Sequence, residues 1–403
     1  MPDLTIPIPR TPPDLKTISE ITIKWLLEKA PEKIITPTKT WKNEHWRVAR
    51  WAIWAQGIGP MLYFHLRDKA SFNEFPRHFC QYLSGQYYLN SQRISVMMDE
   101  LYTILDAFNE NRIDVIPLKG SLLNVLYYKD PGLRPMADID LLVKPVDMEC
   151  IHNLLSKMGY KVLNESWRHR VYVIAKASRK LVLEGEHPEN PRQLEIHFDI
   201  RENFLGVDYR LSDLMWNNCH PGKIGNSSGM ILDPWALLIH LLLHTNRHIW
   251  KHSARFRQLV DISIVASELS KNDWSKFLEE MACISRKHVF YSSFLFVMKY
   301  PGMDLPSEVC DKLSDYNNTS LHKLLKRMDL SDFSVCNPSP ISPFERFRWN
   351  ESGRDHLTSF LHIISPAHSW SFLLWFICYM MGFSRYDPFN DYFIKLRNYV
   401  VGK

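Results

Sequence analysis

Two short runs decide the fold: Val115-Ile116-Pro117-Leu118-Lys119-Gly120-Ser121 and Asp138-Ile139-Asp140-Leu141-Leu142-Val143. The first is an apolar run that ends in a Gly-Ser turn, and the second is an apolar strand that opens with two carboxylates. Residues two apart in a strand point to the same side. We therefore expect Asp138 and Asp140 to share one face while Ile139 points into the core. Their like charges repel, which favours a divalent cation between them, and Mg²⁺ or Mn²⁺ suits oxygen ligands that share the ion with phosphates.

The Gly-Ser turn is typical of a phosphate site, because its backbone N–H groups and the start of the following helix point the same way. Gly120 permits a positive φ and a close backbone approach. We expect Ser121 to bind phosphate, to cap the helix, or both. Lys119 is expected to neutralise a triphosphate, with an ordinary surface lysine as the alternative. The fork of Arg134 suits phosphate, and the alternative is a salt bridge that holds its loop on the acid pair.

The order strand, Gly-Ser, helix and Asp-x-Asp resembles the polymerase-beta-like nucleotidyltransferase superfamily. Residues 113–120, Tyr127-Tyr128, Arg134 and 138–143 are similar to a narrower bacterial family, the uncharacterised nucleotidyltransferases of the NTP-transferase-5 type. The similarity is strongest from about Asn90 to Ile200. It implies an α+β fold with a small mixed β-sheet core. It also implies a metal-dependent enzyme (EC 2.7.7-like) that transfers NMP from an NTP, with ATP as first candidate, to an acceptor hydroxyl or phosphate.

A pair of metal ions that clamps the attacking and leaving oxygens needs three carboxylates. The resemblance places the third acid in Leu194-Glu195-Ile196, so we assign Glu195 to a metal and to drawing the proton from the acceptor. Asp199 is the competitor, because strand alternation puts it with His197 on the same side as Glu195.

Three further residues are candidates for contact with the acceptor: His197, His244 and Asp261. The last two fall where the family carries a similar His and Asp. His240, His244 and His248 form one helical stripe, but no carboxylate completes a metal motif at the spacing of H-E-x-x-H. Core or interdomain histidines are therefore the favoured interpretation.

Composition and texture predict five parts of the chain. They are a flexible arm (1–16), an N-terminal helical region (17–112, with helices at 18–29, 45–66 and 75–111), an α/β nucleotidyltransferase core (113–232, with a hairpin at 171–177 and 180–184), a helical bundle (233–336) and a linker with a C-terminal helical segment (337–403).

The composition is 45% apolar among 403 residues, with a net charge of +5 and a pI near 8.7. This balance permits a polyanionic substrate, but no concentrated Lys/Arg stripe argues for nucleic acid. Seven scattered cysteines without a C-x-x-C pair favour a reducing, cytoplasmic compartment and argue against a zinc site. No P-loop, Rossmann or α/β-hydrolase motif occurs in a sequence context that would support it.

Residues 356–384 contain no Lys, Arg, Asp or Glu, and 372–381 are apolar throughout. A run of this length is shorter than the roughly 20 apolar residues of a membrane span. A packed C-terminal helix is favoured, and contact of 372–381 with a membrane surface or a partner is the alternative.

Three rival functions stay open at this point. The same acids can promote attack at the γ-phosphate, which would make the protein a phosphotransferase. A toxin-like enzyme that modifies tRNA or a protein is the second rival, and a non-catalytic nucleotide-binding protein is the third. The acceptor itself, whether small molecule, peptide or tRNA, is not indicated by the residues.

Overall fold

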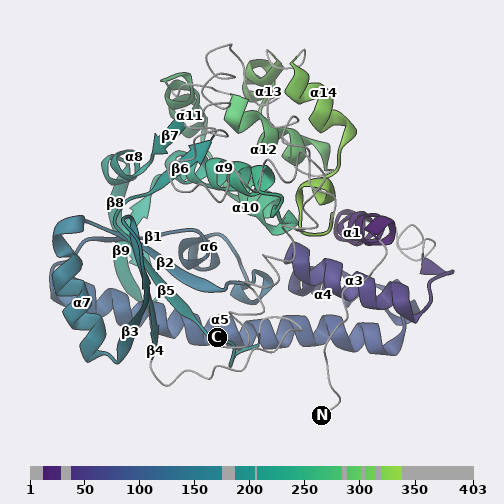
Figure 1. The fold of residues 1–403 in the computed structure, drawn as a ribbon, viewed down its shortest axis with the longest axis horizontal. Coiled ribbons are helices and arrows are strands. Elements are labelled where there is room, and N and C mark those ends of the chain that lie inside the picture. The colour runs from purple at the N-terminus through teal and green to yellow at the C-terminus, as the bar shows by residue number, and fades with distance from the viewer. Residues whose placement is uncertain are drawn as a thin grey trace, which may run out of the picture.

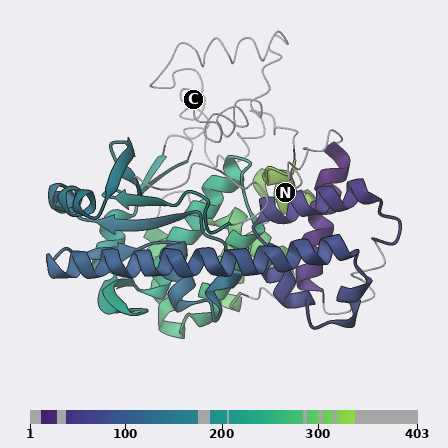
Figure 2. The same ribbon diagram turned by 90° about the horizontal axis from the view of Figure 1, so that it is seen from below.

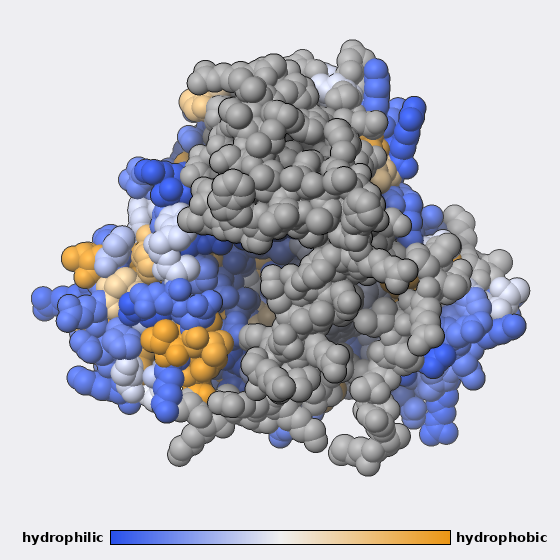
Figure 3. All heavy atoms as spheres, in the orientation of Figure 1, coloured by the Kyte–Doolittle hydropathy of each residue, from blue (hydrophilic) through white to orange (hydrophobic). Residues whose placement is uncertain are grey.

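The computed structural model describes residues 12–28, 38–174, 187–204, 207–283, 288–300, 305–314 and 319–337. The expected second half of the hairpin (180–184), the linker and the uncharged stretch 356–384 with its apolar run 372–381 lie outside these residues. Among the described residues, no helix combines the length and apolar character that crossing a membrane requires. Figure 3 shows a mostly hydrophilic described surface, with a compact hydrophobic group near β3 (Tyr160–Glu165), where Val162 and Leu163 are exposed.

The N-terminal region is helical, as predicted. It consists of α1 (Pro12–Leu27), α3 (Asn43–Gln56), α4 (Gly59–Leu66), a short η2 (Ala70–Glu74) and α5 (Arg77–Glu110). The first helix begins at Pro12, inside the expected arm, because prolines are tolerated in a first helical turn and Leu15 is buried. The 34 residues of α5 cross the molecule beneath both the N-terminal helices and the sheet (Figures 1 and 2).

The described residues of the core form a five-stranded mixed sheet in the order β1-β2-β5-β4-β3. Besides β3, the strands of this sheet are β1 (Val115–Pro117), β2 (Asp138–Val143), β4 (His169–Ile174) and β5 (Gln193–His197). Strand β2 runs antiparallel to β1 and parallel to β5, while β4 is antiparallel to both β3 and β5. The fold is therefore α+β, as expected. The helices that connect these strands are α6 (Gly120–Leu126) and α7 (Met148–Lys157), with the short turns η3 (Pro131–Leu133) and η4 (Pro145–Asp147).

One face of this sheet packs on α5. Ile139, Leu141 and Ile196 from the strands are fully buried with Leu101 and Leu105 of α5 in a single apolar cluster. The predicted apolar stripe of this helix therefore forms the floor under the sheet. Because residues alternate along a strand, the side chains between these apolar ones face away from α5.

Two small ribbons after β5 were not predicted. They pair β6 (Arg201–Phe204) with β7 (Val207–Arg210) and β8 (Cys219–Ile224) with β9 (Ser227–Leu232), with α8 (Ser212–Asn217) between them. The second ribbon turns at Gly225, whose φ of 58° suits a tight hairpin. The Gly225-Asn226 pair is the sequence signal that marks this turn.

The C-terminal bundle begins at Pro234, with Asp233 at the N-cap position, as predicted. Its elements are α9 (Pro234–Trp250), α10 (Phe256–Glu268), α11 (Lys271–Cys283), α12 (His288–Lys299), α13 (Ser307–Ser314), α14 (Ser320–Arg327) and η5 (Leu330–Phe333).

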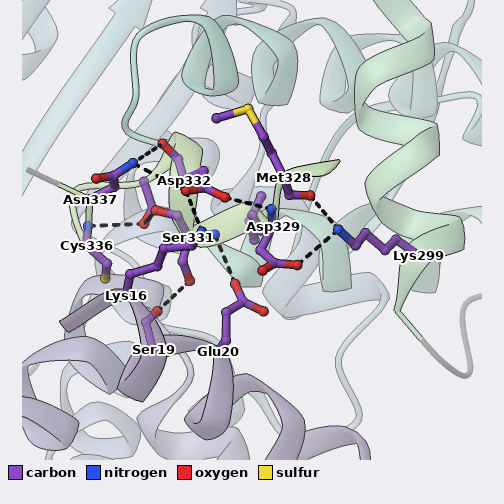
Figure 4. Close-up of polar contacts among 12 residues, drawn as sticks. Lys16, Ser19, Glu20, Lys299, Met328, Asp329, Ser331, Asp332, Cys336 and Asn337 are labelled. Atoms are coloured by element: carbon purple, nitrogen blue, oxygen red, sulfur yellow. Dashed lines mark hydrogen bonds and ion pairs between the residues drawn. The ribbon is translucent and has the colours of Figure 1, made fainter. Parts of the chain in front are cut away.

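A buried polar network joins the two ends of the described chain (Figure 4). The backbone N–H of Ser331 donates to Glu20 at 3.1 Å, the hydroxyl of Ser331 donates to Ser19 at 2.8 Å, and Lys16 pairs with Asp332 at 2.8 Å. Burial is the largest cause that raises the pKa of Glu20. These contacts fix η5 against α1.

Gln56, which is fully buried at the end of α3, extends this network to the bundle. Its side-chain nitrogen donates to the hydroxyls of Ser19 at 3.1 Å and Ser334 at 3.3 Å, and its oxygen accepts from the backbone N–H of Phe256 at 2.8 Å. Phe256 is the first residue of α10. One side chain thus connects the N-terminal helices, the segment after η5 and the start of α10.

Replacing Gln56 with Leu should lower the free energy of unfolding by about 2–4 kcal/mol, because it removes the acceptor of the buried Phe256 N–H and two further hydrogen bonds, to Ser19 and Ser334. Chemical denaturation measures this change. The matched control is Gln81→Ala on the exposed face of α5, which should change stability by less than about 0.5 kcal/mol. Equal effects of the two substitutions would contradict the connecting role of Gln56.

Candidate active site

The three predicted acids come from two adjacent strands. The parallel register of β2 and β5 places Glu195 directly beside Asp140. Alternation along β5 adds His197, and one ligand atom from each of Asp140, Glu195 and His197 lies within 4.8 Å of the others. Asp138 and Asp140 line the same pocket, as expected for residues two apart. Asp140 thus shares the pocket with Asp138 and lies close to Glu195 and His197, which are not among the residues that line that pocket.

Asp140 is almost fully buried and is surrounded by donors. Its Oδ1 lies 2.9 Å from Lys119 Nζ and 2.9 Å from His197 Nε2. Burial opposes ionisation of this carboxyl, but the charge of Lys119 and the contact with His197 hold its pKa far below the usual range. Burial by itself would lower the pKa of Lys119. The negative charges of Asp140 and Asp138 outweigh this effect of burial and raise the pKa to about 12. Asp140 is therefore a carboxylate and Lys119 an ammonium.

The other two acids are not balanced in this way. Burial and the negative charges of Asp140 and Asp138 raise the pKa of Glu195 to about 7. Burial and the charge of Asp140 also raise the pKa of Asp138. Burial is the largest cause of both shifts, and the neighbouring negative charges add to it. Asp140, Glu195 and His197 could together hold a metal ion through two carboxylates and an imidazole, and carboxylate oxygens are ligands that hard divalent cations prefer.

The turn before α6 differs from its expected geometry. The positive φ belongs to Lys119, at 47°, and not to Gly120. Gly120 is needed for space instead, because a Cβ there would come within 2.6 Å of both Arg134 Nη1 and Met136 Sδ. A non-glycine residue with this backbone is strained, and such strain gathers at functional sites.

Ser121 turns inward rather than toward a phosphate. The N-cap of α6 is Lys119 and not Ser121, so the capping expectation was wrong. Ser121 is fully buried, and its hydroxyl accepts the backbone N–H of Asp140 at 2.9 Å. The side chain is also not among the residues that line the pocket. Its structural effect is to fix the backbone of Asp140.

Arg134 and Asp261 pair with each other across the boundary between core and bundle. Arg134 donates from Nε and Nη2 to the two oxygens of Asp261, both at 2.8 Å, and the hydroxyl of Tyr128 adds a third bond at 2.8 Å. Both partners are buried. Arg134 thus forms a salt bridge, but its partner is Asp261 of the bundle and not the acid pair. Both oxygens of Asp261 are occupied, which disfavours Asp261 as a proton acceptor.

A pocket of about 350 Å³ lies between the core and the bundle. Its walls include both aspartates of β2 and the expected His244 and Asp261. The full lining is Lys119, Gly120, Arg134, Met136, Ala137, Asp138, Asp140, Leu241, His244, Thr245, His248, Ser253, Arg255, Arg257, Gln258, Asp261 and Val335. Asp199 is not in this set. It pairs with Arg201 at 2.8 Å and accepts from Ser212 at 3.1 Å.

Sequence reasoning missed the bundle wall of this pocket. Ser253, Arg255 and Arg257 lie in the turn after α9 and the first turn of α10. Arg257 donates to the backbone oxygen of Pro135, next to Arg134. The only local signal is the alternation of a serine and two arginines after a helix, which does not by itself indicate a site.

The family model described as "Uncharacterised nucleotidyltransferase" matches residues 42–300, which include the acid cluster and most of the pocket. The chain belongs to this family. The resemblance to this family that was expected from the sequence is thereby confirmed. Among solved structures, the antibiotic-resistance factor ANT(2'')-Ia is similar at 11% identity, over 47% of this chain and 93% of that one, with a TM-score of 0.35. A search of curated proteins found no match.

The charge on Glu195 should make the metal-free nucleotidyltransferase less stable as pH rises. The folded-state pKa of about 7 exceeds the ordinary value of 4.5, so the native state binds more protons between these two values and loses stability as pH rises through them. Glu195→Gln should therefore match wild type below pH 4.5 and exceed it above pH 7, by about 3 kcal/mol at most. Urea denaturation in EDTA across pH 4–8 measures this difference.

The control for this measurement is Glu189→Gln, which alters an exposed glutamate close to β5. Its stability difference from wild type should not depend on pH in this range. A constant difference for Glu195→Gln would contradict the electrostatic description of the cluster.

Proposed function

We propose that this protein is a metal-dependent nucleotidyltransferase that moves NMP from an NTP, with ATP as first candidate, to an acceptor hydroxyl or phosphate. The observation that carries the proposal is the excess negative charge of Asp138, Asp140 and Glu195 beside a pocket whose other walls bear lysine and arginine. Membership of a nucleotidyltransferase family supports it. A divalent cation would neutralise the acids, and a polyphosphate would neutralise the lysine and the arginines. The two together would complete this charge pattern.

Asp138, Asp140 and Glu195 are the residues that would hold Mg²⁺ or Mn²⁺. When bound, the metal neutralises phosphate oxygens and so stabilises the charge that develops during transfer. His197 lies 2.9 Å from Asp140 and 3.5 Å from Glu195. It therefore orients both carboxylates from beside them.

The remaining roles follow from contacts in the pocket. Lys119, held at Asp140, and the guanidinium groups of Arg255 and Arg257 provide positive charge for the triphosphate. Gly120 allows Arg134 and Met136 to pack closely against the turn that carries Lys119. Glu195, beside Asp140 in the register of β2 and β5, is the proposed acceptor of the proton from the acceptor hydroxyl. Arg134 and Asp261 hold the two walls together.

The experiment that tests this function compares α- and γ-labelled NTPs against tRNA, peptide and sugar acceptors, with Mg²⁺ or Mn²⁺. We expect the α-label on the acceptor and pyrophosphate as the second product. Transfer of the γ-label with release of a nucleoside diphosphate would identify a phosphotransferase instead. Nucleotide binding without turnover on any acceptor would count against an enzyme.

Asp138→Asn, Asp140→Asn and Glu195→Gln should each reduce turnover by about a hundredfold or more, because each removes an acid that holds the metal. Asp199→Asn is the matched control on the same strand end and should change turnover only a few-fold. Circular dichroism should show an intact fold in all four variants. A larger loss in Asp199→Asn than in Glu195→Gln would reassign the third acid.

A further inference from the structure

Three side chains form a hydrogen-bonded series along the bundle wall, and a carboxylate lies at its far end. The hydroxyl of Ser253 lies 2.9 Å from His248 Nδ1, and His248 Nε2 lies 3.2 Å from His244 Nε2. His244 Nδ1 in turn lies 3.5 Å from Glu202 Oε1. Ser253, His248 and His244 line the pocket, whereas Glu202 of β6 is buried behind them. This series of side chains thus leads from the pocket to the buried carboxylate of Glu202.

The protonation states of the two histidines decide which atom donates in each of these hydrogen bonds. Burial is the largest cause that lowers the pKa of both histidines well below the usual value, and the charge of Lys119 lowers each further. Neutral imidazole carries a single N–H. Glu202 pairs with the guanidinium of Arg247 at 3.3 Å and faces His244 Nδ1, so we assign the proton of His244 to Nδ1. His248 must then donate from Nε2, which leaves its Nδ1 to accept the proton of Ser253.

This direction leaves the lone pairs of Ser253 Oγ for the pocket. A hydroxyl bonded to a base, with the base oriented by a third group, is the arrangement of an activated nucleophile. The backbone holds the serine in place, because His252 has a φ of 54° and the N–H of Ser253 donates to the backbone oxygen of His248 at 2.9 Å. A positive φ is uncommon in a residue other than glycine, and at His252 it turns the backbone sharply.

The surroundings of Ser253 also suit the nucleotide donor. Arg255, two residues further on, lines the same pocket of about 350 Å³ as Asp138 and Asp140. A guanidinium of this kind pairs with phosphate oxygens. Ser253 is only half-buried, so its oxygen is accessible from the pocket, unlike that of Ser121.

We propose that Ser253 is itself an acceptor, and that the protein attaches a nucleoside monophosphate to its own Ser253 hydroxyl. This inference rests on the proposed nucleotidyltransferase function. Ser253 Oγ forms a bond to the α-phosphorus, the bond from that phosphorus to the bridging oxygen breaks, and the electron pair leaves with pyrophosphate. The serine proton passes to His248 Nδ1, the Nε2 proton of His248 to His244, and the Nδ1 proton of His244 to Glu202. The product is a serine phosphodiester.

The test incubates the full chain with each NTP and Mg²⁺ or Mn²⁺, without any other acceptor, and measures intact mass followed by peptide mapping. We expect the mass of one NMP on the peptide that contains Ser253. Ser253→Ala should remove the adduct, and His248→Gln should slow its formation by about tenfold or more. The control is Ser267→Ala, which alters an exposed serine of α10 and should leave labelling unchanged.

Titration of the metal–NTP complex and a pyrophosphate assay separate the two ways in which the test can fail. If the protein binds NTP and releases pyrophosphate with an external acceptor but shows no adduct at Ser253, this inference falls and the proposed function stands. An adduct that persists in Ser253→Ala would likewise overturn this inference alone. If neither binding nor pyrophosphate release is found, both fall. An adduct with only the mass of a phosphoryl group would overturn both.

Discussion

Repulsion among carboxylates on paired strands is the constraint on which this structure depends. The register of β2 and β5 forces Asp140 and Glu195 side by side, and the two-residue repeat brings Asp138 to the same pocket. Lys119 and His197 contact Asp140 directly and hold its pKa low, whereas burial and the neighbouring negative charges raise the pKa values of Glu195 and Asp138. A protein keeps such an arrangement at a cost in stability, which is reasonable when a cation and a polyphosphate complete it.

The rest of the fold holds two walls around that charge. The long helix α5 supports the sheet, and Gln56 connects the N-terminal helices to the first residue of α10. The buried Arg134–Asp261 pair joins the loop before β2 to the same helix. The pocket therefore consists of segments that are distant in sequence but held by buried polar contacts, which is how a rigid site is built. Breaking one of these contacts should disturb the pocket as well as the stability.

The sequence allowed the acid cluster to be predicted because its signals are local. Asp138 and Asp140 follow the period of a strand, and Glu195 lies between apolar residues. The inward turn of Ser121 and the strain at Lys119 were not predictable, since they depend on how α6 packs on β2. The wall formed by Ser253, Arg255 and Arg257 also has no local pattern, because it becomes a wall only when α10 docks on the core.

Direct binding of Mn²⁺ tests the central claim. Isothermal titration calorimetry with the full chain and a non-hydrolysable NTP analogue at pH 7.5 should show Mn²⁺ binding in wild type. The same titration should show binding weakened by at least about tenfold in Asp140→Asn and in Glu195→Gln, because each removes a ligand. Unchanged Mn²⁺ affinity in both variants would contradict the claim that these acids form a cation site.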